Sequence, residues 1–322
     1  MSAFIDPLED SSAAERSPDL PSPFPTSGST GKSGRKALLL FWHRDPAGFI
    51  WSILFILILL AITIGPQFVQ SPSAIDPSKR LLGPSSEHWL GTDNFGRDIL
   101  SRIINAGRIS LAIGAAVTVV SCVVGSMIGL LSGFYNRVDG PTMRLVDAML
   151  AFPPLILAIA LVAFFGQGAK SEIIALCIVL TPYIARVVRS STLALRDREY
   201  VAAARSSGLG GVSILRRHIL PNAFPTILVQ ASFVFAFVLL SDAALSFLGL
   251  GVASPTPTWG NMVADARPYI TSSPGFIVFP GLAIVIVVMA LNIIGDSVRD
   301  LVDPRSRSLV DLQRLRSMQG KD

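Results

Sequence analysis

The segment Glu199–Asn222, EYVAAARSSGLGGVSILRRHILPN, decides how the rest of the chain is interpreted. It is too polar to cross a membrane, yet apolar runs long enough to be spans lie on both sides of it. Ala202–Arg205 is expected to form a short helix that ends in a turn at Gly208, Gly210 and Gly211. A second amphipathic segment, Val212–Leu220, follows, and Pro221 either ends it or starts the next helix.

The composition is that of a protein with many membrane spans. Of the 322 residues, 51% are hydrophobic and 15% are charged, whereas a soluble domain has about 25% charged residues. The net charge of +5 comes from basic residues in short loops and tails beside apolar runs, so it indicates membrane topology and no nucleic-acid partner. Cys122 and Cys177 lie in apolar runs and are interpreted as small buried residues, and the three scattered histidines predict no metal site.

Six apolar stretches predict an all-α membrane protein with six transmembrane helices. The expected spans are Phe49–Ile64, Ser110–Tyr135, Ala148–Phe165, Ile173–Val188, Thr226–Leu248 and Phe276–Ile294. The second carries small residues at four-residue spacing, which lets helix backbones approach closely. The segment 99–113 is expected to be an amphipathic approach to it, and a short loop is expected at 136–147.

The lysines and arginines predict the orientation. With both termini in the cytoplasm, most of the 27 basic residues fall on the inner side, including all those from Arg186 to Arg217. The expected organisation is a disordered tail at 1–36, a permease domain at 37–305 with a cytoplasmic loop at 190–222, and a cytoplasmic tail at 306–322. The run 29–33, STGKS, is not interpreted as a phosphate-binding loop, because Thr26 stands where that motif needs glycine.

The loop resembles the Glu-Ala-Ala loop of permeases in binding-protein-dependent ABC importers. Two positions depart from the general pattern: Ala202 replaces the glutamate and His218 replaces an isoleucine. Both departures fit the peptide and nickel branch, whose loop reads EYV-x-AAR…RHILPN. The resemblance implies that the loop couples the permease to an ATPase through Glu199, Tyr200, Ala203, Ala204, Arg205, Gly208, His218, Leu220 and Pro221.

Further signatures extend the resemblance over about Phe49–Arg305. The run His88–Asp98, HWLGTDNFGRD, is similar to the HPLGTD-x-x-GRD signature of the C-type permease, with Trp89 in place of proline. If the resemblance is set aside, the sequence around Asp93 and Asp98 predicts that both residues form turns. Ser246–Gly251 resembles the LSFLGLG run, and Asn292–Arg305 is similar to the closing N-x-x-GD-x-x-RD-x-x-DPR.

The resemblance implies a type I ABC importer fold and a location in the bacterial cytoplasmic membrane. It implies a second permease that completes a heterodimer, two cytoplasmic ATPase subunits that bind ATP and Mg, and an external substrate-binding protein. No cofactor is expected in this chain, and transport proceeds by ATP-driven alternating access. Di- or oligopeptides are the expected substrates, with nickel or a glutathione-like solute as the alternative.

Three polar residues in the fifth span are candidates for the transport pathway. Asp242 is expected at a gate, since an ionisable residue inside a span is costly and usually faces a bundle interior or a wet path. The family commonly has glutamate there. A helix–helix hydrogen bond or a site near the outer interface is the other interpretation, and Ser241 and Gln230 are further candidates. An ion-coupled transporter would need repeated halves with intramembrane charges, and a membrane enzyme would need a catalytic pair; neither pattern is found.

Overall fold

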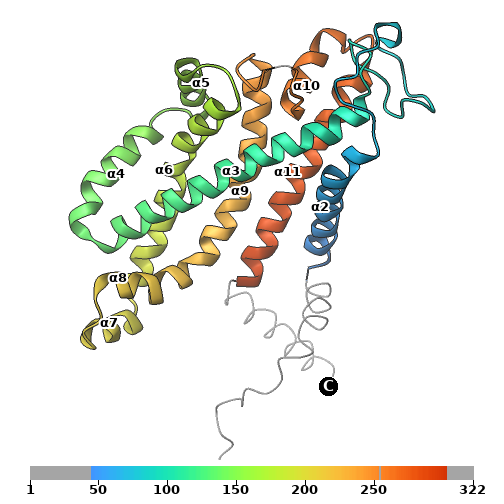
Figure 1. The fold of residues 1–322 in the computed structure, drawn as a ribbon. Coiled ribbons are helices and arrows are strands. Elements are labelled where there is room, and N and C mark those ends of the chain that lie inside the picture. The colour runs from blue at the N-terminus through green and yellow to red at the C-terminus, as the bar shows by residue number, and fades with distance from the viewer. Residues whose placement is uncertain (1–44, 254, 303–322) are drawn as a thin grey trace, which may run out of the picture. The chain divides into compact units, whose positions relative to one another are not determined.

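The computed structural model describes residues 45–253 and 255–302. The expected tails at 1–36 and 306–322, the STGKS run and the end of the closing motif at 303–305 lie outside these residues. Within the described part, five helices are long and apolar enough to cross a membrane, and a bent pair makes a sixth candidate span. The five are α2 (Pro46–Ile64), α3 (Ile99–Phe134), α6 (Ala169–Arg196), α9 (Leu220–Phe247) and α11 (Pro274–Val302) (Figure 1). The prediction of an all-α membrane protein is confirmed.

Helix α3 is one unbroken helix, not an approach segment followed by a span. Its 36 residues are about 54 Å long at 1.5 Å per residue, so it exceeds a hydrocarbon core of about 30 Å. No proline interrupts residues 99–134, so nothing separates the two expected segments. Asp98 caps the helix: its Oδ2 accepts a hydrogen bond from Ser101 N at 2.7 Å.

Glycines bring α3 into close contact with α6. A Cβ atom added at Gly125 would lie 2.8 Å from Ile184 Cβ, and one added at Gly133 would lie 2.7 Å from Thr192 Cβ. These distances are too short for carbon atoms, so only glycine fits at either position. The predicted role of small residues at four-residue spacing is confirmed for this helix pair.

The segment expected as a short loop at 136–147 is a helix. Helix α4 spans Asn136–Leu150 and α5 spans Pro154–Phe165, and the two meet at an angle of 89°. The third span is therefore not a continuous helix over 148–165. The break coincides with Pro153 and Pro154, because proline removes a helical donor and disfavours helical geometry in the preceding residue. Arg189 in α6 holds α4 through two hydrogen bonds of 2.5 and 2.6 Å to Asp139.

The segment after the polar loop runs into the fifth span without a break. Helix α8 (Gly211–Ile214), a π-helical turn η3 (Leu215–Ile219) and α9 follow one another as one helix. Pro221 lies inside this continuous helix, directly after Leu220, whose N–H donates to Leu215 O in the π-helical pattern. Pro221 therefore neither ends the segment nor starts a separate helix, and the π-helical turn lies where proline removes a helical hydrogen bond.

The end of the bundle opposite the polar loop carries a further helix, α10 (Trp259–Ala266), which the sequence suggested only as a polar segment (Figure 1). Thr258 and Asn261 form a reciprocal capping box at its start. Trp259 is 2% exposed and packs with Ile62 of α2 and Phe276 of α11 in one apolar cluster. Its Nε1 donates to Ile103 O of α3 at 3.0 Å. This tryptophan therefore joins four helices.

Candidate functional site

The polar loop begins with helix α7 (Glu199–Ser206), which is longer than the predicted 202–205. It ends in a Schellman motif. Gly208 N donates to Arg205 O at 2.9 Å, and Leu209 N donates to Ala204 O at 3.2 Å. Gly208 has φ +79°, and a Cβ added there would meet no atom within 4 Å. The position requires glycine for its backbone conformation, as predicted, and not for lack of space.

One face of α7 packs against its own chain. Val201 and Ala204 are buried and belong to an apolar cluster with Phe134 at the end of α3 and with Ile214 and Ile219 farther along the loop. The resemblance implied that Ala204, like Ala203, belongs to the surface that couples the loop to an ATPase. In the structure Ala204 faces the protein's own interior, so its small size serves the packing of α7 onto α3 and η3.

The opposite face of α7 is open. Glu199, Tyr200, Ala203 and Arg205 are exposed, as expected for a surface that receives a partner. The Arg205 guanidinium lies 5.2 Å from the centre of the Phe134 ring, a cation–π distance.

Three further predicted residues lie at the other end of the loop. One of them is close to α7, and the other two lie at the start of α9. The ring of His218 lies 6.4 Å from the ring of Tyr200, so these two predicted residues are close together. Leu220 and Pro221 lie at the start of α9. A basic hollow of about 500 Å³ lies between α7 and the ends of α3 and α6, lined by Phe134, Tyr135, Asn136, Arg137, Arg196, Asp197 and Arg205.

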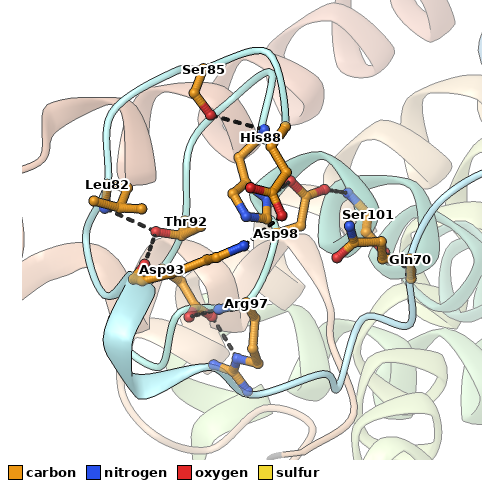
Figure 2. Close-up of polar contacts among 11 residues, drawn as sticks. Gln70, Leu82, Ser85, His88, Thr92, Asp93, Arg97, Asp98 and Ser101 are labelled. Carbon is orange, nitrogen blue, oxygen red and sulfur yellow. Dashed lines mark hydrogen bonds and ion pairs between the residues drawn. The ribbon is translucent and has the colours of Figure 1, made fainter.

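A second polar cluster orders the segment before α3 (Figure 2). Asp93 is fully buried, and its Oδ1 accepts hydrogen bonds from the backbone N–H groups of Phe95 and Arg97. Its Oδ2 lies 2.6 Å from Arg97 Nε and 3.5 Å from Arg102 Nη1. Asp98 Oδ1 lies 3.0 Å from His88 Nδ1. Of the two aspartates predicted to be turn formers, Asp93 also holds buried ion pairs with two arginines, and Asp98 pairs with a buried histidine ring.

This cluster reaches α10 through Arg102. Its Nη2 lies 3.8 Å from Asp265 Oδ2. Burial raises the pKa of Asp265 above its ordinary value, and the nearby Arg102 guanidinium opposes that shift. The GTDNFGRD run therefore forms a platform that these ion pairs join to α3 and α10. Trp89, the residue that departs from the family pattern, is 71% exposed on it.

The pathway candidates in α9 fall at two different places. Gln230 lines two adjoining hollows of about 190 and 440 Å³, which also share Phe233. Ser241 is buried, and its hydroxyl donates to Phe237 O within its own helix at 2.9 Å. The structure does not bring Gln230 together with the other two residues, since they lie three turns apart on α9.

Asp242 is 2% exposed and joins three helices. Ser110 Oγ of α3 donates to its Oδ2 at 3.2 Å, and Ser246 Oγ donates to its Oδ1 at 3.4 Å. The same Ser110 Oγ accepts a hydrogen bond from Trp259 N of α10 at 3.1 Å. The geometry is that of a helix–helix hydrogen bond, which was one of the two interpretations of this residue.

The sequence analysis missed a second buried carboxyl group, Glu172. It lies in the first turn of α6, is 0% exposed and lies against Asp242. The expected fourth span began at Ile173, one residue later, so Glu172 was left in the preceding loop. Its position directly beside an apolar run was the available signal, but only the fold shows that it faces Asp242. Within residues 45–253 and 255–300, no group of three or more His, Cys, Asp or Glu is placed to hold a metal ion.

Known proteins that are similar in sequence to this chain are transport proteins. Residues 121–308 match the family described as binding-protein-dependent transport system inner membrane component. The chain is 44% identical to the dipeptide transport system permease protein of Alkalihalophilus pseudofirmus, over 78% of this chain and 83% of that protein. It is 43% identical to the nickel transport system permease protein of Escherichia coli, over 78% of this chain and 91% of that protein.

The fold is similar to that of a solved ABC transporter. A chain of the MetNI methionine ABC transporter, in a crystal of its inward-facing conformations, superposes with a TM-score of 0.54. The match covers 62% of this chain and 96% of the other, at 19% sequence identity. This likeness confirms the predicted permease fold of an ABC importer.

Proposed function

Because this chain belongs to the family of binding-protein-dependent transport system inner membrane components, we propose that it is the permease subunit of an ATP-driven importer of di- or oligopeptides. It is a multi-pass protein of the bacterial inner membrane and is not itself a catalyst. Its helices form half of a translocation pathway, and a second permease subunit supplies the other half.

The observation that carries the coupling role is the way α7 is attached to the spans. Its buried face packs on Phe134 at the end of α3, and η3 and α9 continue directly from the loop. A displacement of α7 therefore moves the end of α3 and the start of α9 together. Gln230 and Asp242 lie farther along α9, so a push on the loop acts on the helix that carries the pathway candidates.

Two cytoplasmic ATPase subunits are the source of that push. The open face of α7, with Glu199, Tyr200 and Arg205, supports docking in an ATPase groove, and the basic hollow beside it suits an acidic side chain of the same partner. Hydrolysis of ATP takes place in those subunits. On the other side of the membrane, the platform ordered by Asp93 supports docking of an external substrate-binding protein.

Peptides are the favoured substrates because the hollows around Gln230 offer hydrogen-bonding and aromatic groups, with Arg299 as the one charged residue in the lining of the larger hollow and no charged residue in the lining of the smaller. Tyr183, Gln230, Phe233 and Phe237 line the smaller hollow. Such a wall tolerates varied side chains and contacts the peptide backbone. Nickel or a glutathione-like solute is the alternative, since the binding protein selects among the substrates of this branch.

Reconstitution of the complete transporter in vesicles tests the proposal. The chain is assembled with its genomically neighbouring permease, ATPases and binding protein, and uptake of a labelled dipeptide, a hexapeptide, nickel and glutathione is compared. We expect peptide uptake that stops when ATP is removed and survives collapse of the proton gradient. Uptake that depends on the proton gradient alone would show a secondary transporter, and uptake of nickel without peptide would reassign the substrate. The purified chain alone is expected to hydrolyse no ATP.

A further inference from the structure

The carboxyl groups of Glu172 and Asp242 form a pair that the coupling role does not use. Glu172 lies at the start of α6 and Asp242 near the end of α9. Ile173 and Leu176, beside Glu172, pack in one apolar cluster with Val238 and Leu245, which flank Asp242, so both carboxyl groups lie in the contact between α6 and α9 and act on each other electrostatically. Both residues are buried, at 0% and 2% exposure. Helices α6 and α9 are the two that the polar loop connects, and this pair joins them at the ends remote from the loop (Figure 1).

The two carboxyl groups differ in the hydrogen bonds that they accept. Asp242 accepts hydrogen bonds from the hydroxyl groups of Ser110 and Ser246. Neither oxygen of Glu172 receives a hydrogen bond from any donor among the described residues. An ionised carboxylate in this position would be buried, without a donor, and against a second carboxylate, which are the least favourable conditions for its charge.

Nearby basic groups do not neutralise the pair. On the packed elements, Arg102 of α3 is engaged with Asp93 and Asp265, while Arg108 of α3 and Lys170 of α6 are exposed. The remaining charged residues of α6 and α11 belong to the other ends of those helices: Arg186, Arg189, Arg196, Asp296, Arg299 and Asp300. Asp265 of α10 faces Arg102, and the exposed Arg267 that follows α10 lies over the Phe247 ring of α9, 4.7 Å from its centre. Helix α9 has no charged residue besides Asp242.

We propose that Glu172 and Asp242 are a proton-binding site, in which Glu172 carries the proton and donates a hydrogen bond to the ionised Asp242. One proton makes Glu172 a hydrogen-bond donor to Asp242 and removes one of two adjacent charges. Asp242 keeps the negative charge because the serine hydroxyls stabilise it. The start of α6 favours a negative charge on Glu172, but that preference is small beside the cost of two unpaired buried carboxylates.

The shared proton holds together the ends of α6 and α9 that lie remote from the polar loop. A second link at the same place, from Gln167 Nε2 to Gly249 O at 2.8 Å, joins the segment before α6 to the segment after α9. Removal of the proton would set two negative charges against each other and separate α6 from α9. A movement of the polar loop that separates α6 from α9 must therefore break this contact, and the strength of the contact depends on the proton. This inference does not depend on which substrate is transported.

Infrared spectroscopy of the full-length chain in lipid nanodiscs tests the site. We expect a carbonyl band from a protonated carboxylic acid at neutral pH, which shifts in heavy water. Glu172→Gln should remove the band, since the amide donates to an ionised Asp242 and no proton is held. Asp242→Asn should keep the band but shift it, because Glu172 then donates to an amide oxygen. Glu87→Gln, at an exposed carboxyl paired with Lys79, is the matched control and should change nothing.

Thermal unfolding over a pH series gives a second measurement. The folded chain holds a proton that the unfolded chain releases above the ordinary glutamate pKa of about 4.3. Above that pH, the contribution of this site to the stability therefore falls as pH rises, until the folded chain also releases the proton, and Glu172→Gln should remove this contribution to the slope. Persistence of the band in Glu172→Gln, an unshifted band in Asp242→Asn, or an equal pH slope in the wild type and Glu172→Gln would each overturn the proposal. An unfolding temperature that rises with sodium at constant ionic strength would show a bound cation in place of the proton.

Discussion

A Cβ atom added to Gly129 in α3 would lie 2.6 Å from the carbonyl oxygen of Ala185 in α6. That oxygen belongs to the helix backbone and cannot move aside as a flexible side chain would. This contact fixes how closely α3 and α6 approach each other. A side chain larger than that of glycine at position 129 would push the two helices apart.

Gly129→Ala is therefore expected to weaken the contact between α3 and α6. Overpacking of a close contact costs about 1–3 kcal/mol, so the unfolding temperature of the purified chain should fall. Gly281→Ala in α11 is the control, because a Cβ there meets no atom within 4 Å, and alanine favours a helix by about 1 kcal/mol over glycine. Equal unfolding temperatures for the two variants would contradict the packing described for Gly129.

Gly208→Val is expected to uncouple the loop while leaving the spans folded. Valine at a positive φ is strained by about 1–3 kcal/mol, so the Schellman turn that ends α7 should open. Vesicle uptake should fall, measured beside the amount of ATPase that co-purifies.

The same loop offers a matched control for Gly208. Gly210 is also exposed with no atom near an added Cβ, but its φ is −66°, which valine adopts readily. Gly210→Val should transport normally. Normal uptake with a normal ATPase complement in Gly208→Val would remove the basis for a coupling role of this turn.

Ala204→Glu and Ala203→Glu distinguish the two faces of α7. Ala204 is 7% exposed in the apolar cluster with Phe134, so a carboxylate there should detach α7 from the spans. The loop should then be less ordered, and uptake should fall. Ala203 is exposed, so glutamate there should leave the isolated chain unchanged and impair only ATPase binding. Limited proteolysis of the loop, with and without the ATPase, separates these outcomes. Cleavage of both variants at the same rate without the ATPase would contradict the burial of Ala204.

Asp93→Asn is expected to loosen the segment before α3. Removing one partner of a buried ion pair costs about 3–5 kcal/mol, and Asp93 serves both Arg97 and Arg102. Protease sensitivity between residues 77 and 98 should rise, and binding of the external protein should weaken. Glu87→Gln, at an exposed pair, is the control. Unchanged sensitivity in Asp93→Asn would show that the turn backbone alone orders the platform.

Asp242→Leu is expected to impair transport more than assembly, as the buried carboxyl group suggested from the sequence. Leucine leaves the hydroxyl groups of Ser110 and Ser246 without their acceptor. Interhelical hydrogen bonds of this kind average about 0.6 kcal/mol, so the chain should still assemble. Ser241→Ala, which removes a bond only within α9, should transport normally. Normal uptake by assembled Asp242→Leu would make the residue purely structural.

The sequence by itself determined the class of protein, the family and the position of the loop. Apolar length identifies the spans, since a bilayer requires about 20 apolar residues, and the spacing of Ala203, Ala204, Gly208 and Pro221 identifies the loop. Gly208 was predictable for a local reason: its need for a positive φ depends only on the helix that ends there.

Only the tertiary structure decided which faces meet. It turned Ala204 inward, made a helix of residues 136–150 and brought Glu172 against Asp242 across 70 positions of sequence. Local pattern does not contain these contacts, because a span that is apolar on all sides carries little information about which side is buried. The partners of a buried polar group follow from how whole helices pack, and that is fixed only when the chain has folded.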